Sequence, residues 1–284
     1  MAMKRISKKS EDLWGKIQDS VKFIRSQTSL KPEIAMVLGT GLGQLTQKVK
    51  KAVAIPYHEI PHFPVSTVES HKGQLILGEF AGRPVVVMEG RFHCYEGYTP
   101  QEVSFPVRVM KMLGAKLFLV TNACGGLNLE YRKGELVLIE DMINFTGLNP
   151  LVGPNDERLG PRFPDMCAPF SGNLMTQMEA VGRKLQIPLR RGVYIGVLGP
   201  NLETKAEYRM MRNFGADTVG MSTVPEVITA VHMGMDVLGI SVVTDLCDPD
   251  HLHPVNIQEI IKTANQAGPK LDRLIENFIQ TVKL

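Results

Sequence analysis

The segment LFLVTNACGGLN, residues 117 to 128, joins an uninterrupted apolar run to a glycine pair. Apolar residues without polar alternation are typical of a strand that is buried on both faces in a parallel sheet. Open α/β sheets bind ligands at the carboxyl ends of such strands, where glycines let backbone N–H groups approach an anion. The segment therefore predicts a central parallel strand that ends in a ligand loop at Asn122, Ala123, Gly125 and Gly126. A tight turn that only connects two elements explains this segment equally well.

The composition describes a globular protein with a large core. The chain has 284 residues, of which 44% are hydrophobic and 21% charged, with a formal net charge of +3. Charges of both signs are spread along the chain, which argues against a nucleic-acid partner. The basic residues 1–9 precede no apolar signal region, and no apolar run approaches the ~18 residues of a membrane span. We expect a flexible segment at 1–9, no membrane partner and a cytoplasmic location.

The cysteines Cys94, Cys124, Cys167 and Cys247 are far apart and form no CxxC or Cys/His pattern. Zinc sites and structural disulfide frameworks show closer, regular spacing. We therefore expect free thiols in a reducing compartment and no metal site.

Apolar runs alternate with helical patterns along the whole chain. Helices are predicted at 11–28, 99–114, 174–185 and 257–282, and strands at 34–38, 74–80, 84–89, 117–121, 135–139, 193–198, 215–222 and 237–243. The short spacing of 74–80 and 84–89 indicates a hairpin, which makes the sheet mixed. The expected fold is α/β, with a mixed twisted sheet flanked by helices in a single domain, residues 1–284.

Capping boxes mark three helix starts, at Thr99 to Glu102, Thr204 to Glu207 and Thr223 to Glu226. The second box places Glu203 just outside a helix, where it is a surface neighbour of the cap or a ligand carboxylate. The third places Ser222 at a helix N-terminus, where its hydroxyl can bind an anion or serve only as a cap.

Glycine and proline crowd residues 147–169, which excludes regular structure there. A loop of this length in a compact domain is usually functional or disordered. Phe163 lies within this loop and is expected to be an exposed aromatic residue. Its ring either covers a ligand, in this subunit or in a neighbouring one, or only holds the loop in place.

Anion-binding residue types recur at three predicted loops. Thr40 lies in the glycine loop 39–43, which lacks the spacing of a dinucleotide or P-loop motif. Arg91 and His93 follow the hairpin, and an Arg and a His two apart at a strand end share one face. His71 and Ser222 complete the set. No Ser-His-Asp triad and no glycosidase-type carboxylate pair is recognisable, so the pattern favours inorganic phosphate as a bound reactant.

Seven ordered motifs carry a resemblance to a known family. GTGLG, SHKG, GRFHCYEGY, TNACGGLN, RFPDM, GPNLETKAE and VGMSTVPEV resemble the trimeric purine nucleoside phosphorylase family, which includes methylthioadenosine phosphorylases. The resemblance implies a pentosyltransferase of purine salvage. Such an enzyme uses phosphate to cleave the N-glycosidic bond of purine (deoxy)ribonucleosides, giving free base and (deoxy)ribose 1-phosphate. It also implies a homotrimer with no cofactor, in which phosphate is a co-substrate.

The resemblance also assigns roles to individual residues. It implies phosphate ligands at Thr40, His71, Arg91, His93, Ala123 and Ser222, purine contacts at Leu202, Glu203, Val219 and Asp245, and ribose contacts at Tyr95, Met221, Ile257 and, from the neighbouring subunit, Phe163. The residues expected to act in catalysis are His93, Glu203 and Asp245.

Two departures from the family pattern leave the substrate open. Asp245 stands where an asparagine is common, and a carboxyl can donate to purine N7 only when protonated. A protonated Asp245 would also accept from a 6-amino group, which favours adenine-type bases and requires burial to raise its pKa. Ile257 stands where a histidine often faces the 5′-hydroxyl and would suit a 5′-methylthio group, although His251 or His253 could take the polar role. The main interpretation is a purine nucleoside phosphorylase; the alternatives are a methylthioadenosine or 6-aminopurine phosphorylase and, from another class, a silent purine-binding protein.

Overall fold

The structure is a computed structural model that describes residues 12–39, 43–65 and 73–284. Its first helix, α1 (Leu13–Gln27), begins at Asp12, whose carboxylate accepts a hydrogen bond from Gly15 N at 2.9 Å. The predicted helix range 11–28 includes Asp12, which in the structure is the N-cap residue and lies before the first helical residue. Ile17, Val21 and Ile24 form the buried face of α1, as their helical spacing predicts.

The described chain forms one nine-stranded mixed sheet, more strands than the sequence predicted. In spatial order the strands are β2 (Lys50–Pro56), β3 (Gln74–Phe80), β4 (Arg83–Glu89), β1 (Ile34–Leu38), β5 (Leu117–Gly126), β8 (Thr218–Gly220), β7 (Leu189–Gly196), β6 (Leu136–Asn144) and β9 (Asp236–Leu246). Because β9 pairs with β5 as well as with β6, the last five strands close on themselves. The α/β fold with a mixed sheet in a single domain is confirmed.

The hairpin is confirmed, since β3 and β4 pair antiparallel across a turn at Ala81 and Gly82. β2, which the sequence did not predict, adds to the outer edge of β3. The short elements η1 (Gly43–Lys48), η2 (Tyr57–Glu59) and η3 (Cys94–Glu96) are 3-10 helices. The 3-10 helix η1 follows the glycine loop 39–43, of which residues 40–42 lie outside the described residues.

β5 is the central strand that residues 117–128 predict, and it lies parallel to β1 and β9. The prediction of a loop at the glycine pair is wrong, because β5 continues through Gly125 and Gly126 and pairs antiparallel with β8. Close packing explains both glycines. A Cβ on Gly125 would lie 2.5 Å from Cys247 Sγ, and one on Gly126 would lie 2.9 Å from Val243 Cγ1.

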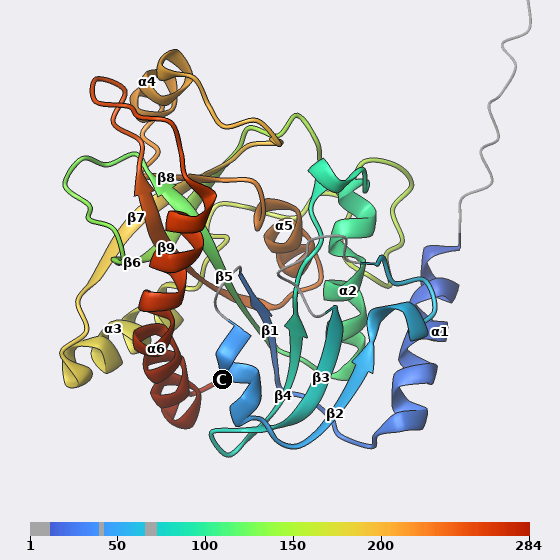
Figure 1. Ribbon diagram of the computed structural model, residues 1–284. Coiled ribbons are helices and arrows are strands. Elements are labelled where there is room, and N and C mark those ends of the chain that lie inside the picture. The colour runs from blue at the N-terminus through green and yellow to red at the C-terminus, as the bar shows by residue number, and fades with distance from the viewer. Residues whose placement is uncertain (1–11, 40–42, 66–72) are drawn as a thin grey trace, which may run out of the picture.

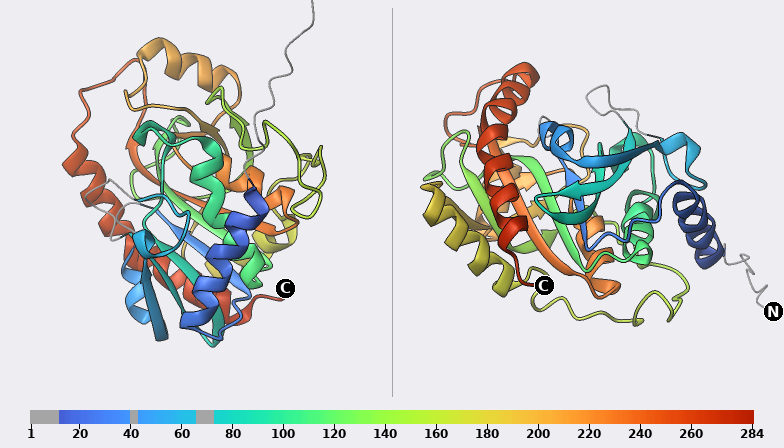
Figure 2. Two further views of the ribbon diagram at one scale, coloured as in Figure 1. Left: turned by 90° about the vertical axis from the view of Figure 1, so that its right-hand side faces the viewer. Right: turned by 90° about the horizontal axis from the view of Figure 1, so that it is seen from below.

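Helices cover both sides of the sheet (Figures 1 and 2). α2 (Pro100–Leu113) packs against α1 and α5 (Val224–His232), while α3 (Gly172–Leu185) packs against α6 (Ile257–Thr281). The short helix α4 (Lys205–Asn213) lies at the upper rim in Figure 1. All three predicted capping boxes are present, at α2, α4 and α5. Within the described ranges, no helix has the length and apolar character that a membrane span requires.

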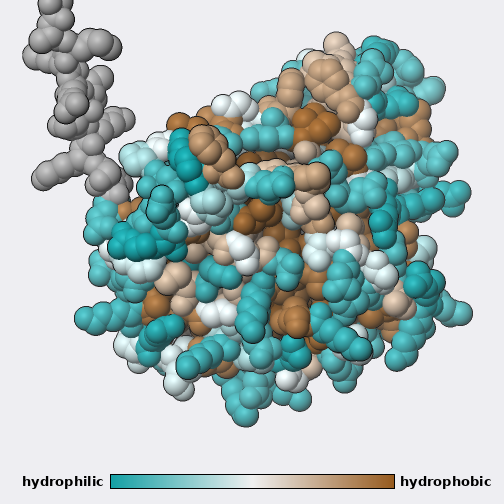
Figure 3. Space-filling view, turned by 180° about the vertical axis from the view of Figure 1, so that it is seen from behind, coloured by the Kyte–Doolittle hydropathy of each residue, from teal (hydrophilic) through white to brown (hydrophobic). Residues whose placement is uncertain are grey.

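Residues 147–169 contain no helix or strand, as predicted. Two hydrophobic side chains of this loop are largely exposed, Val152 at 71% and Phe163 at 86%. Hydrophobic side chains also interrupt the mostly hydrophilic back face of the molecule (Figure 3).

Candidate active site

A pocket of about 230 Å³ opens where the carboxyl ends of β5 and β9 meet. It is lined by Gly39, Arg91, His93, Tyr95, Asn122, Ala123, Cys124, Gly125, Leu202, Glu203, Tyr208, Val219, Gly220, Met221, Ser222, Thr244, Asp245, Cys247 and Ile260. Parallel strands present their ligand-binding ends at such an edge. Of the fourteen site residues predicted from the sequence, twelve lie in the described residues, and ten of these line the pocket.

Arg91 forms the buried floor of one end of this pocket. Its side chain is 2% exposed, and its Nη2 lies 2.6 Å from Glu226 Oε2. Its Nη1 donates to the carbonyl oxygen of Thr121 at 2.7 Å. These contacts hold the guanidinium in one orientation beside the pocket, and its positive charge suits an anionic ligand.

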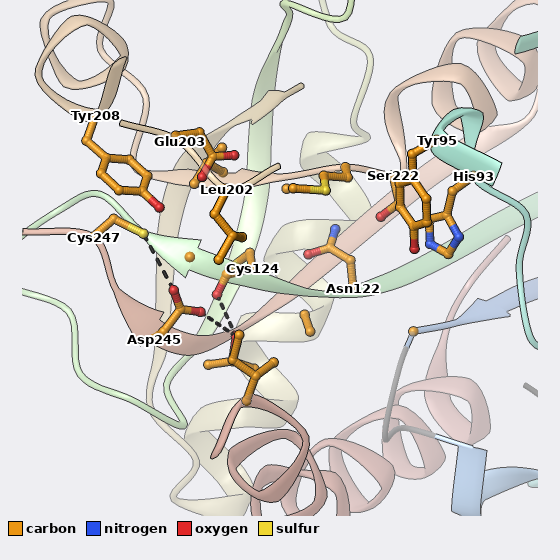
Figure 4. A pocket seen from close by; sticks show the side chains of 18 of the residues that line it. His93, Tyr95, Asn122, Cys124, Leu202, Glu203, Tyr208, Ser222, Asp245 and Cys247 are labelled. Carbon is orange, nitrogen blue, oxygen red and sulfur yellow. Dashed lines mark hydrogen bonds between the residues drawn. The ribbon is translucent and has the colours of Figure 1, made fainter. Parts of the chain in front are cut away.

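His93 stands beside Arg91, at the start of η3. Its Nδ1 lies 2.8 Å from Glu96 Oε1, which also accepts from the His93 backbone N–H at 2.9 Å. An ionised carboxylate can only accept, so Nδ1 carries the hydrogen of this contact. The ring stacks on Tyr95 with centroids 4.6 Å apart, so the two side chains share one wall of the pocket (Figure 4).

Ser222 completes this end from the start of α5. The N-cap of α5 is Thr223, so Ser222 is not the cap that the sequence left possible. Thr223 has a φ of 72°, and its Oγ1 accepts from Asn122 Nδ2 at 2.9 Å. Because this bond and the Glu226 capping bond hold Thr223, the Ser222 hydroxyl and the α5 N-terminus lie at the pocket. Arg91, His93 and Ser222 therefore make one end of the pocket suited to a phosphate-like anion.

Two carboxyl groups mark the other end. Burial raises the pKa of Asp245, whose Oδ1 lies 2.8 Å from Thr244 Oγ1 and whose Oδ2 lies 3.7 Å from Cys247 Sγ. Burial also raises the pKa of Glu203, and the charge of Asp245 raises it further. From the sequence, Asp245 was expected to donate a hydrogen bond only if burial raised its pKa. Its pKa is raised, and the cause is desolvation.

Two of the predicted site residues, Thr40 and His71, lie outside the described residues. Two others are described but do not line the pocket: Phe163 is 86% exposed and Ile257 is 57% exposed. Ile260, one turn further along α6, lines the pocket instead. His251 and His253 line a neighbouring cavity that shares Thr244, Asp245 and Ile260 with the first.

The sequence analysis did not predict three side chains at the end of the pocket that holds the two carboxyl groups, namely Cys124, Tyr208 and Cys247. Cys247 follows Asp245 by two positions, so the alternation of a strand could have placed both on one face. Tyr208 gave no local signal, because it reaches the pocket from the buried face of α4.

Comparison with known proteins bears on this geometry. The family model for the phosphorylase superfamily matches residues 33–280. Purine nucleoside phosphorylase 1 of Bacillus subtilis is 45% identical over 264 residues, covering 93% of this chain and 97% of that protein. The chain belongs to the purine nucleoside phosphorylase family.

Other relatives in the purine nucleoside phosphorylase family extend the match. The Bos taurus enzyme of that name is 43% identical over 272 residues, covering 93% of this chain and 94% of that protein. A structure of Schistosoma mansoni purine nucleoside phosphorylase isoform 2, in complex with cytosine and ribose-1-phosphate, has a TM-score of 0.92 at 36% identity and covers 95% of this chain and 98% of its own. The same organism's purine nucleoside phosphorylase in complex with adenosine has a TM-score of 0.90 at 39% identity, covering 94% and 97%.

Proposed function

We propose that this chain cleaves the N-glycosidic bond of purine nucleosides with inorganic phosphate, releasing the free base and ribose 1-phosphate. One observation carries the proposal. A single pocket has a cationic, hydroxyl-bearing end at Arg91, His93 and Ser222, and a carboxyl end at Glu203 and Asp245. A phosphate and a purine can therefore bind on opposite sides of one sugar.

The chemistry explains why the two ends differ. As the glycosidic bond breaks, positive charge grows on the ribose and negative charge on the departing base. Phosphate held by Arg91, His93, Ser222 and the Ala123 amide stabilises the sugar cation and then bonds to C1′. By family resemblance Thr40 and His71 would join these ligands. A proton donor at purine N7 stabilises the base, and we assign this role to Asp245, by analogy with oxyanion-hole donors worth ~3 kcal/mol each.

Tyr95 and Met221 line the pocket and are assigned to the ribose, while Leu202 and Val219 are assigned to the faces of the purine. Glu203 is assigned to the edge of the base. Phosphate serves as co-substrate, and no cofactor is required by this scheme.

We infer a homotrimer in which Phe163 enters the pocket of a neighbouring subunit. Its 86% exposure in the single chain supports this role, because an aromatic side chain gains from burial. The four free cysteines fit a reducing compartment such as the cytoplasm.

A second candidate, phosphorolysis of 5′-methylthioadenosine or another 6-aminopurine nucleoside, is favoured by one observation. Asp245 is a carboxyl with a raised pKa, which when neutral can donate to N7 and accept from a 6-amino group. Ile257, proposed for the 5′ group, lies outside the pocket of the single chain and adds no support from its position.

The test is phosphate-dependent base release from inosine, guanosine, adenosine and 5′-methylthioadenosine, measured side by side at neutral pH. Preference for inosine and guanosine supports the first candidate, and preference for methylthioadenosine supports the second. Release of no base from any of them, with purine binding retained, would leave a silent purine-binding protein and contradict both.

A further inference from the structure

The loop 147–169 contains no helix or strand, yet its side chains fix it to two helices. The Arg158 guanidinium lies over the Trp14 ring of α1, 4.4 Å from the ring centroid. His232, the last residue of α5, faces the loop from the other side, and its Nε2 lies 3.3 Å from Asn155 Oδ1. These two contacts hold the middle of the loop against the body of the protein.

The contact at α5 is part of a chain of three hydrogen bonds. Arg108 Nη1 of α2 lies 3.2 Å from His232 Nδ1, and His232 Nε2 reaches Asn155. Asn155 Nδ2 donates to the Gly160 carbonyl oxygen at 3.1 Å. A guanidinium can only donate, so His232 Nδ1 accepts and the hydrogen of the neutral ring is on Nε2, which donates to Asn155. The chain of donors therefore runs in one direction, from Arg108 to Gly160, and it requires a neutral His232.

Burial and close packing make this chain of bonds the support of the loop. Arg108 is 5% exposed and His232 is 4% exposed, so water does not readily replace the bond between them. Gly160 packs directly on the end of α5: its φ is 153°, and a Cβ at this position would overlap the His232 carbonyl oxygen. Phe163 follows Gly160 by three positions. The segment that carries Phe163 therefore starts from a backbone position that His232 and Asn155 fix.

The surroundings of His232 favour its neutral form. Burial lowers the pKa of His232 and the charge of Arg108 lowers it further, whereas the Pro161 carbonyl oxygen raises it. A proton on Nδ1 would face the Arg108 guanidinium and would remove the acceptor of their hydrogen bond. The charged groups around this corner come from three elements and are Arg108 and Lys111 of α2, Asp156 and Arg158 of the loop, and Asp236 of β9.

We propose that the hydrogen-bonded chain from Arg108 through His232 anchors the loop that presents Phe163 to the neighbouring subunit, and that protonation of His232 releases this anchor, so that nucleoside binding weakens as pH falls. This inference rests on the proposed function, since it takes Phe163 as a nucleoside contact in that subunit. His232 is then a positioning residue that acts through the loop. Because the anchored loop requires a neutral His232, proton binding favours the released loop, and the released fraction increases as pH falls.

Trp14 reports the state of the loop without any need for catalysis. It is the only tryptophan of the chain, and its ring lies against Arg158 of the loop. The experiment records its fluorescence emission in the intact protein, without substrate, from about pH 5 to about pH 8, the range in which histidine titrates. We expect one transition whose midpoint lies below ~6.5, the ordinary pKa of histidine. Emission that does not change over this range would overturn the proposal.

Variants assign the transition to His232. His232→Gln keeps one acceptor and one donor but cannot titrate, so it should abolish the transition and keep the emission of the neutral form. His62→Gln is the matched control, because His62 lies 3.2 Å from Asp19 on the same helix as Trp14, and its transition should remain. Asn155→Ala cuts the chain while leaving the buried pair in place, and should show the low-pH emission at every pH. A transition that persists in His232→Gln, or unaltered emission in Asn155→Ala, would overturn the proposal whether or not the protein cleaves nucleosides.

The effect on the reaction should be on KM and not on kcat. KM for the preferred purine nucleoside is measured at saturating phosphate over the same pH range in the unsubstituted protein and in His232→Gln. The ratio of the two values cancels the titration of phosphate and of the pocket residues, which both proteins share. We expect this ratio to rise from near one at neutral pH to about five below the midpoint, the factor that corresponds to one hydrogen bond, while the ratio of kcat stays near one.

The two readouts separate the possible failures. A KM ratio that does not change with pH would overturn the proposal. If Phe163→Ala also leaves KM unchanged, the error lies in the role proposed for Phe163 in the neighbouring pocket. If no nucleoside is cleaved, the proposed function is contradicted, and Trp14 emission in His232→Gln still decides whether His232 anchors the loop.

Discussion

Glu226 joins the phosphate end of the pocket to the start of α5, and its replacement has a calculable cost. Its Oε2 lies 2.6 Å from Arg91 Nη2 and accepts from the Thr223 backbone N–H at 3.0 Å. Both side chains of the ion pair are 2% exposed. Glu226→Ala therefore removes the carboxylate facing a buried guanidinium and a helix cap in one step.

The magnitude follows from these two losses. Removing one partner of a buried ion pair costs ~3–5 kcal/mol, and losing a helix cap costs ~1 kcal/mol. We expect Glu226→Ala to lower the free energy of unfolding by about 4 kcal/mol or more. Glu226→Gln keeps a neutral acceptor and should lose about 2 kcal/mol, as for a hydrogen bond to a charged group. Since Arg91 then loses its fixed orientation, KM for phosphate should rise in both variants.

The assay is urea denaturation at fixed protein concentration, followed by circular dichroism, with phosphate KM measured alongside. Glu207→Ala is the matched control, because Glu207 makes the same capping box with Thr204 at α4 but is exposed and faces no buried arginine. It should lose far less stability and leave the phosphate KM unchanged. If Glu226→Ala is no more destabilising than Glu207→Ala, the buried pair does not stabilise the site as reasoned.

Four further outcomes are expected. His93→Ala should lower phosphate-dependent turnover by about 100-fold or more, the cost of losing one pocket donor; unchanged turnover would contradict the phosphate assignment. Asp245→Asn should shift preference toward 6-oxopurine nucleosides, measured as the inosine to adenosine ratio of kcat/KM, and an unchanged ratio would remove the case for adenine chemistry. Phe163→Ala should raise KM for nucleoside, and a monomer in light scattering would contradict its role in a neighbouring pocket. Burial raises the pKa of Asp272 to about 6, so the folded state binds this proton more tightly than the unfolded state does, and stability falls as pH rises from about 4 to 6. Asp272→Asn should therefore stabilise the protein by roughly 2 kcal/mol at pH 7 and little at pH 4. Denaturation measured at both pH values tests this.

The local sequence predicted most of the elements, because their signals lie within a few residues. Thr99, Thr204 and Thr223 each stand three positions before a glutamate, and all three boxes form. The apolar run at 117–121 predicted the central strand. Local signals failed where pairing with distant strands decides the structure. Taken by themselves, Gly125 and Gly126 indicate a loop. In the structure they continue β5, and glycine is required there because β8 and β9 pack too closely to leave room for side chains.

For the candidate site, too, some residues were predicted from the sequence and others were found only in the structure. Motifs and family resemblance identified Arg91, His93, Ser222, Glu203 and Asp245 from the sequence, since each lies at a recognisable strand end or helix start. Only the tertiary structure brought Tyr208 and Cys247 into the pocket that Glu203 and Asp245 line, and Glu226 against Arg91. These contacts join residues far apart in the chain, and their energies depend on burial and on distance through space, which no local pattern encodes.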